Sequence, residues 1–220
     1  MRYRKILILC FIIIGCKNST KEGNENLESN TITSTEMIDQ VVENVSIAPI
    51  DQWDFRGIAM SKTDMFFGIE EVYKLQVADD VKTSTFVAIN NVKINYTGGR
   101  YRISVIVKSL EENNNIGIRI QEVYPNRYDV VFDLNTIKVK GTFKQGDFIE
   151  EESVFIESLG DGWLKCNITA EIYASYFRLV LGPTNVPEKQ TKSWEAEALN
   201  NKERAILIVP SSLKVEELEN

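Results

Sequence analysis

The sequence predicts an all-β protein, an antiparallel jelly-roll β-sandwich that follows a signal peptide and a flexible tether. Apolar and polar residues alternate along most runs from about Val45 onward, as they do in strands with one buried face. Turn-forming residues separate these runs at short intervals. No long run after the tether has the periodicity of a helix. Many short strands with spaced turns are typical of antiparallel sandwiches.

Length and composition limit the classes of protein that fit. The chain has 220 residues, enough for one domain of ordinary size once a signal and a tether are set aside. With 43% hydrophobic and 26% charged residues it is neither a disordered nor a multi-span membrane chain. The absence of histidine excludes histidine-based catalytic triads and histidine-ligated metals. The net charge of -7 disfavours binding to nucleic acid.

The first element is a targeting segment. Arg2, Arg4 and Lys5 form a positive start, and residues 6–14 are an apolar run too short to span a bilayer. The next two residues, Gly15 and Cys16, complete a stretch that resembles the lipobox of bacterial lipoproteins.

This resemblance implies cleavage before Cys16, so that residues 1–15 are a lipoprotein signal peptide and Cys16 carries the acyl chains. Each buried methylene contributes about 0.8 kcal/mol, so several acyl chains hold a protein on a membrane without a spanning helix. Cleavage removes three of the 25 basic residues and leaves 22 against 32 acidic ones, a net charge of -10. Attraction to anionic lipid is therefore weak, and the acyl chains are the expected anchor. Lys17 in place of Asp after the cysteine favours the outer membrane, on the periplasmic or the external side.

A tether and a short helix are expected next. Residues 17–34 are polar and rich in Asn, Ser, Thr and Glu, a composition that cannot bury a core. Residues 35–45 place Met37, Val41 and Val45 at four-residue steps, which would suit a short helix. The predicted organisation is thus a lipidated linker over 16–44 and a jelly-roll domain over 45–220.

The strands of this domain follow in order. Residues 53–90 supply the opening strands without a diagnostic motif. The alternating runs after them are residues 101–108, 116–121, 128–134, 154–158, 164–168 and 177–181. Turn signals lie between them, of which the clearest is Gly160-Asp161-Gly162, a tight hairpin turn in which glycine adopts a positive φ at low cost. The single cysteine of the domain, Cys166, lies within one of these runs and is expected to be a buried free thiol.

Several of these stretches resemble a known kind of domain. They resemble carbohydrate-binding-module-like jelly rolls of bacterial secreted and phage tail-fibre proteins. The stretches are residues 101–108, 132–136, 156–166 and the closing run over 206–218. Two positions depart from the pattern: Ile137 stands where glycine is usual and Val209 where tryptophan is usual. The resemblance implies a jelly roll of the concanavalin or galactose-binding kind, and a non-catalytic module that binds carbohydrate.

A sugar site needs aromatic rings for the C–H faces of the pyranose and planar polar groups for its hydroxyls. The candidate ligand-binding residues are Trp53, Tyr124, Asn126, Arg127 and Trp194. Each also has a structural interpretation: an opening core strand for Trp53, a solvated hairpin end for the three residues around Pro125, and a loop anchored on the sandwich for Trp194.

Other functions stay open at this point. A structural or adhesive envelope protein with a protein partner is the main alternative, and a small polysaccharide lyase or hydrolase is a third. The acidic residues 150–152 are expected to be a solvated sheet edge. No cofactor is expected, and Asp79-Asp80 or Glu216-Glu217 would be the acids for a structural calcium ion, although no calcium-loop motif is present and no metal ligand is assigned.

Overall fold

The structure, a computed structural model, describes residues 39–78, 84–95, 98–110, 115–196 and 204–219. The predicted signal peptide, the lipidation site Cys16 and the tether lie outside the described residues, as does the pair Asp79-Asp80. No helix in the described part of the chain is long and apolar enough to cross a membrane.

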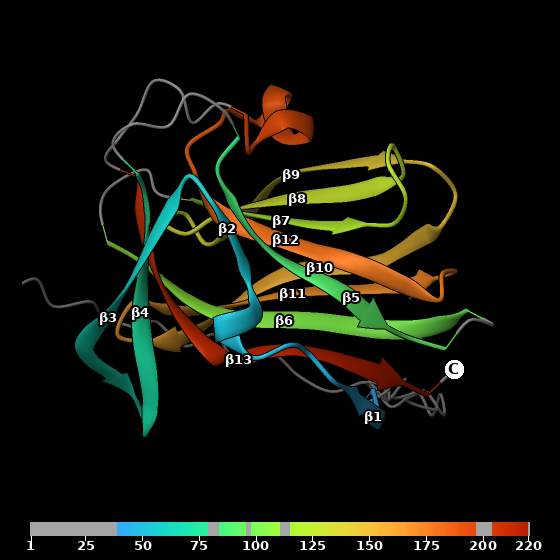
Figure 1. Cartoon of the computed structure of the whole chain (residues 1–220), viewed down its shortest axis with the longest axis horizontal. Coiled ribbons are helices and arrows are strands. Elements are labelled where there is room, and N and C mark those ends of the chain that lie inside the picture. Colours follow the sequence, from blue (N-terminus) through green and yellow to red (C-terminus); the bar gives the residue numbers. More distant parts are fainter. Residues whose placement is uncertain (1–38, 79–83, 96–97, 111–114, 197–203, 220) are drawn as a thin grey trace, which may run out of the picture. The chain divides into compact units, whose positions relative to one another are not determined.

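Two antiparallel sheets form the domain (Figure 1). Sheet A has the order β10 (Ile149–Gly160), β11 (Trp163–Ile172), β6 (Gly99–Ser109), β13 (Ala205–Leu218), β4 (Glu70–Val77) and β3 (Ile58–Phe67), and β1 (Val41–Val45) also pairs with β13. Sheet B has the order β2 (Asp54–Arg56), β5 (Phe86–Lys93), β12 (Tyr176–Thr184), β7 (Asn115–Gln121), β8 (Arg127–Asp133) and β9 (Lys138–Gln145). Two short 3₁₀ helices are described, η1 (Ile50–Gln52) and η2 (Glu188–Ser193).

The chain passes repeatedly from one sheet to the other. It runs from β5 of sheet B to β6 of sheet A, back through β7, β8 and β9 of sheet B, and then to β10 and β11 of sheet A. It returns to sheet B with β12 and closes in sheet A with β13. The predicted all-β antiparallel sandwich is therefore confirmed, and the six alternating runs after residue 100 all coincide with strands, except that β8 ends at Asp133, one residue before the end of the run 128–134.

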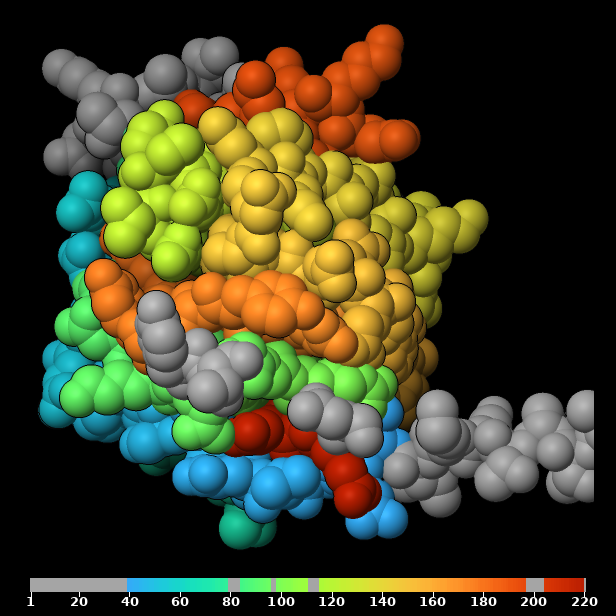
Figure 2. Space-filling model, turned by 90° about the vertical axis from the view of Figure 1, so that its right-hand side faces the viewer, coloured from blue at the N-terminus to red at the C-terminus, as the bar shows by residue number. Residues whose placement is uncertain are grey.

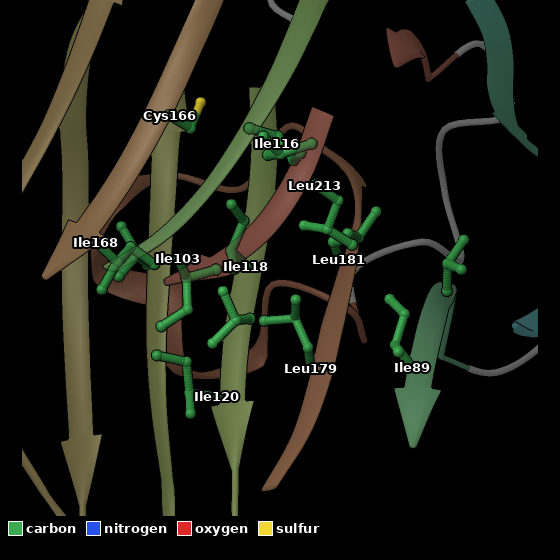
Figure 3. Packing of buried hydrophobic residues seen from close by; sticks show 14 of the residues in the cluster. Ile89, Ile103, Ile116, Ile118, Ile120, Cys166, Ile168, Leu179, Leu181 and Leu213 are labelled. Carbon is green, nitrogen blue, oxygen red and sulfur yellow. The ribbon is translucent and has the colours of Figure 1, made fainter. Parts of the chain in front are cut away.

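The core lies between the two sheets (Figure 3). Alternate residues of each strand point inward, and most of these side chains are fully buried. Strands β6 and β11 of sheet A contribute Ile103, Cys166 and Ile168, and strands β7 and β12 of sheet B face them with isoleucine and leucine side chains. Cys166 is a buried free thiol, as predicted, and its burial raises the pKa of the thiol.

The start of the domain differs from the prediction. Residues 41–45 form strand β1, not the end of a helix, and pair with the last residues of β13, for example Val45 with Val215. The four-residue spacing of Val41 and Val45 does not exclude a short strand, because pairing with the neighbouring strand β13 decides the conformation. The sandwich thus starts before the predicted boundary at residue 45.

The predicted hairpin turn is confirmed. Strand β10 ends at Gly160 and β11 begins at Trp163, so Asp161 and Gly162 form a two-residue turn. Both have positive φ, 51° and 76°, as a type I′ turn requires. The acidic residues 150–152 lie at the exposed start of β10, the edge strand of sheet A. This position agrees with the solvated sheet edge that was expected.

Candidate functional site

A large bulge in β13 shapes the outer face of sheet A. Val209 pairs with Ile106 of β6, and the next paired residue of β13, Lys214, faces Ser104, so residues 210–213 are looped out of the ladder. The hydroxyl of Ser212 fixes this bulge. It donates to the carbonyl of Val209 at 2.6 Å and accepts from the backbone N–H of Ile106 at 2.8 Å.

The bulge separates two neighbouring hollows. The hydroxyl of Ser211 donates a hydrogen bond to Glu70 of β4, and these two residues line both hollows. The first hollow, which we call the tryptophan groove, encloses about 480 Å³ and is lined by Ile47, Ala48, Pro49, Ile50, Trp53, Glu70, Glu71, Tyr73, Pro210, Ser211 and Leu213. The second, the sheet groove, encloses about 490 Å³ and is lined by Phe67, Glu70, Ser104, Ile106, Glu157, Leu159, Lys165, Val209, Ser211, Ser212, Lys214 and Glu216.

The floor of the sheet groove is the sheet itself. Ile106 and Val209 give it an apolar centre, and Ser104 lies beside them on β6. Ser104 is 1% exposed, and its hydroxyl is buried without a hydrogen-bond partner among the described residues. A buried hydroxyl without a partner costs free energy, so a ligand atom or a water molecule that reaches it would be stabilised.

The charged residues of the sheet groove fall into two groups. Glu216 is held by Arg102, whose Nε lies 2.9 Å from the carboxylate, and Glu70 accepts from Ser211. Glu157, Lys165 and Lys214 have no side-chain hydrogen bond or ion pair in the part of the chain that the structure describes. The groove therefore offers one carboxylate acceptor and two ammonium donors for a ligand.

The wall formed by the β3–β4 hairpin is held by a small apolar cluster outside the main core. Val72, Trp163, Leu207 and Val209 are its buried members, and Phe67 packs against them. The rings of Phe67 and Trp163 meet edge to face with their centroids 5.3 Å apart. The ammonium group of Lys108 also lies over the Trp163 ring, 5.7 Å from its centroid. Trp163 thus has a structural role and supports residues that line the groove, Phe67 and Val209.

The tryptophan groove has aromatic walls. Trp53 is 7% exposed, and its indole N–H donates to the carbonyl of Ala48 at 2.8 Å, which fixes the ring. Opposite it, Tyr73 donates its hydroxyl to Glu71 at 3.0 Å, and Lys62 also donates to this carboxylate. The hydrogen bonds from Lys62 and Tyr73 lower the pKa of Glu71. The hydrogen bond to Glu71 in turn raises the pKa of the Tyr73 phenol. This groove therefore combines a ring edge, a phenol and carboxylates.

The five predicted ligand-binding residues are not brought together. Trp53 lies in the tryptophan groove. Tyr124 is 74% exposed in the turn between β7 and β8, where Asn126 donates to Glu122 at 2.8 Å. This turn is the lime-green segment of Figure 2. It lies on the same face of the domain as the starts of β10 and β12. Arg127 points away from the turn and donates to the carbonyl of Lys192 at 2.9 Å.

Trp194 has a structural role instead of a binding role. It is fully buried on the outer face of sheet B, against Phe86, Val131 and Val180. Its ring takes the space that a Cβ on Gly117 would need, at 2.2 Å. Trp194 thus anchors the polar stretch over residues 185–196 on the sandwich. No face of its indole ring is open to a ligand.

A buried ionic cluster fixes Trp194. Asp129 accepts from the indole N–H at 2.9 Å and from Arg119 at 2.6 Å, and Arg127 lies 3.3 Å away. Glu195 completes the cluster, 2.7 Å from Arg119. Burial raises the pKa of Asp129 to about 6, although both arginines act in the opposite direction.

Sequence reasoning did not find Ser104, Ser211 or Ser212. The available signal was the stretch Pro210-Ser211-Ser212, which interrupts the closing run over 206–218. A proline cannot donate to a ladder, so it marks a bulge when it stands inside a strand. Such a bulge is a local device for placing side chains beside a sheet.

No group of three metal-binding side chains is present within the described ranges. Glu216 is paired with Arg102, and Glu217 accepts from the side-chain amide of Asn95 at 2.8 Å. These two acids therefore have protein partners in place of an ion.

Comparison with known proteins gives one distant structural likeness. No family model matches the sequence, and the search of curated proteins gave no match. Among solved structures, the chain is similar to a carbohydrate binding module of Cellvibrio mixtus lichenase 5A, solved in complex with cellotriose. The two share 10% identity with a TM-score of 0.36, over 82% of this chain and 99% of that chain. A likeness at this level says nothing about what this chain binds.

Proposed function

We propose that the chain is a lipid-anchored protein of the bacterial cell envelope that binds glycan in the sheet groove and the neighbouring tryptophan groove, without catalysis. Acyl chains on Cys16 would hold it, on the outer membrane, and the tryptophan and sheet grooves would take the glycan. The sequence supports the anchor, and the two grooves support the binding.

One observation carries the binding proposal. The sheet groove joins an apolar floor, Ile106 and Val209, to polar groups that have no partner among the described residues: Ser104, Glu157, Lys165 and Lys214. A sugar presents C–H faces and hydroxyls that both donate and accept, so it can satisfy such a mixed set. A purely apolar ligand would leave these polar groups unpaired, which is costly.

The charge of the groove favours a neutral or mildly acidic glycan. Lys165 and Lys214 offset the carboxylates of Glu157 and Glu70, and Glu216 is already paired with Arg102. The neighbouring tryptophan groove shares Ser211 and Glu70 with it, so a chain of several sugar units could contact both. Phe67 is the aromatic residue of the sheet groove, and Trp53 and Tyr73 are those of the tryptophan groove.

The arrangement does not support glycoside hydrolysis. That reaction needs two carboxyl groups about 5–10 Å apart, one as an acid and one as a base or nucleophile. In the sheet groove Glu70 accepts from Ser211 and Glu216 is paired with Arg102. Among the carboxylates that line this groove, Glu157 alone lacks a partner in the described residues. A single unengaged acid is consistent with binding.

A glycan-array screen of the full chain in detergent tests the binding proposal. Hits are then titrated against wild type, against Glu157→Gln/Lys214→Met, and against Lys144→Met, an exposed lysine of β9 outside both grooves. We expect saturable binding that the groove variant weakens at least tenfold and the control leaves unchanged. Equal binding by all three chains, or no hit with a folded protein, would contradict the proposal.

The anchor is tested separately. Cells grown with an alkyne-bearing fatty acid should label the wild-type chain, which should fractionate with the outer membrane. Cys16→Ala should abolish both the label and the membrane fractionation. Labelling that persists in Cys16→Ala would place the anchor elsewhere in the chain.

A protein partner is the second candidate function. All three tryptophans are buried, at 7%, 6% and 0% exposure, so the described surface has no open indole platform of the kind many sugar sites use. If the glycan screen gives no hit, crosslinking of the folded chain in intact cells is the next test, and one reproducible partner would favour this function.

A further inference from the structure

The turn of the β3–β4 hairpin exposes a run of apolar side chains. Ile69 is 91% exposed, Phe66 58% and Met65 41%, and Gly68 between them has a φ of 62°. Hairpin turns usually carry polar residues, because they are surrounded by water. A cluster of large apolar residues at such a turn marks a surface that another apolar phase covers.

The hairpin presents this cluster on a rigid support. Phe67, the next residue, packs edge to face on Trp163, and Phe67 pairs with Glu70 across the turn. The base of the hairpin continues the ladder of sheet A through β4 and β13. The exposed side chains therefore stand on a fixed element.

The charges that flank the turn are largely satisfied within the protein. Glu71 is paired with Lys62, and Glu70 accepts from Ser211. Asp64 is the remaining charged residue between Lys62 and Glu71. Residues 65–69, the tip itself, carry no charge, so they can approach an apolar phase while Asp64 and Glu70 stay in water. The net charge of the four charged residues is negative, so an anionic surface would repel the tip.

The position of the tip indicates which apolar phase covers it. The β3–β4 hairpin and strand β1 both extend to the lower edge of the domain in Figure 1, and teal and blue segments are again the lowest in Figure 2. Residues 17–38, which follow the predicted lipidation site, lead directly into β1. A membrane below the domain would thus face both the entry of the chain and the hairpin tip.

We propose that the β3–β4 tip is a second membrane contact, at which Phe66 and Ile69 enter the interfacial layer of a zwitterionic bilayer. This inference rests on the proposed anchor at Cys16, which keeps the domain near the membrane. An acyl anchor on a flexible tether limits the distance of a domain from the membrane but does not fix its orientation. A second, shallow apolar contact fixes the orientation and sets which face of the sandwich looks outward.

The test places an environment-sensitive dye, NBD, at the tip. Ile69→Cys is labelled in the full chain, and Val123→Cys, 61% exposed in the β7–β8 turn, is the matched control. In the mature lipoprotein Cys16 is acylated and Cys166 is buried, so the new thiol is the one that reacts. The labelled chains are reconstituted in phosphatidylcholine vesicles, with and without doxyl-lipid quencher.

A second arm makes the result independent of the anchor. The full chain with Cys10→Ala and Cys16→Ala carries an N-terminal hexahistidine tag and is held on vesicles by nickel-chelating lipid. In both arms we expect a blue shift and quenching of the dye at residue 69 and neither effect at residue 123. Adding Phe66→Ser should reduce the quenched fraction roughly threefold or more, because half of the apolar contact is lost. Phosphatidylglycerol in the vesicles should weaken the effect.

The outcomes separate the two proposals. If the tethered chain shows the effect but the native chain does not associate with vesicles, the anchor at Cys16 is wrong and the tip contact stands. If the native chain associates and residue 69 stays in water in both arms, the tip contact is wrong. A blue shift at residue 69 that depends on protein concentration and not on lipid would also overturn it, because a second copy would then cover the tip.

Discussion

At the scale of single residues, the buried polar side chains of this sandwich have different roles. Asp129 is buried with two arginines and an indole N–H around it, and it holds Trp194 in place. Ser104 is equally buried but has no hydrogen-bond partner in the described residues. The carboxyl group of Asp129 has its hydrogen bonds within the protein, whereas the hydroxyl of Ser104 could bond to a ligand. Exposure alone does not distinguish them.

The titration of Asp129 gives a test of pH dependence. Its pKa in the folded chain is raised to about 6 from the ordinary 3.8, because burial disfavours the carboxylate. A group of this kind stabilises the fold at a pH below the unfolded pKa, and its contribution is lost as the pH rises through 6. From pH 3.5 to 7 wild type should lose about 3 kcal/mol of unfolding free energy relative to Asp129→Asn.

Urea unfolding of both chains over this pH range provides the measurement. The comparison with Asp129→Asn removes the contribution of other carboxylates, such as Glu71, whose lowered pKa has the opposite sign. A difference that is constant with pH would mean that Asp129 stays ionised throughout.

Cys166 gives a second test at this scale. Burial raises the pKa of its thiol, and only a thiolate reacts quickly with disulfide reagents. In a chain with Cys10→Ala and Cys16→Ala, a folded sample should react with Ellman's reagent at least 100-fold more slowly than one in guanidinium. Comparable rates would show that the β11 region opens readily.

At the scale of elements, the stretch that carries η2 depends on close packing over sheet B. Trp194 lies on Gly117 of β7, where an added Cβ would fall 2.2 Å from the indole ring. A Cβ added to Gly182 of β12 would lie 3.4 Å from its closest neighbour, the Cα of Phe86, which is ordinary contact. Gly117→Ala should therefore lower the unfolding free energy by roughly 2–4 kcal/mol and shift tryptophan emission to longer wavelength. Gly182→Ala, the matched control, should cost clearly less. Equal effects of the two variants would show that Trp194 is not tightly seated.

The elements also show what the sequence could predict. Six alternating runs became strands because period two is imposed by the backbone itself. Strand β1 was missed because residues 41–45 are short and mostly exposed, and their conformation is set by pairing with β13, far away in sequence. The same holds for the grooves, whose lining comes from segments between residues 47 and 216 that only the folded sheet brings together.

The candidate site was therefore predicted only in part. A preference for exposed aromatic rings selected Trp53, which does line a groove, and Trp194, which is a core residue. The polar residues around Trp194 suggested an exposed loop. Polar side chains can also be buried when they pair with one another, as Glu195 does with Arg119. The break at Pro210 carried more information about the site than any tryptophan.

At the scale of the whole molecule, the two outer faces of the sandwich differ. The η2 segment and Trp194 cover part of the outer face of sheet B, whereas the outer face of sheet A carries the sheet groove, next to the tryptophan groove. In the proposed arrangement, the anchor and the β3–β4 tip orient the domain on the membrane, and the two grooves bind a glycan of the envelope. The acidic charge of the protein would limit nonspecific binding to anionic lipid.

The most direct test of glycan binding on sheet A is a map of backbone amide shifts in ¹⁵N-labelled protein during titration with a glycan hit. We predict saturable shifts that cluster around Ser104, Lys165 and Lys214, with small changes around Trp53 and Tyr73 for longer glycans. Shifts centred on Tyr124 and the β7–β8 turn, or the absence of shifts at saturating glycan, would contradict the account.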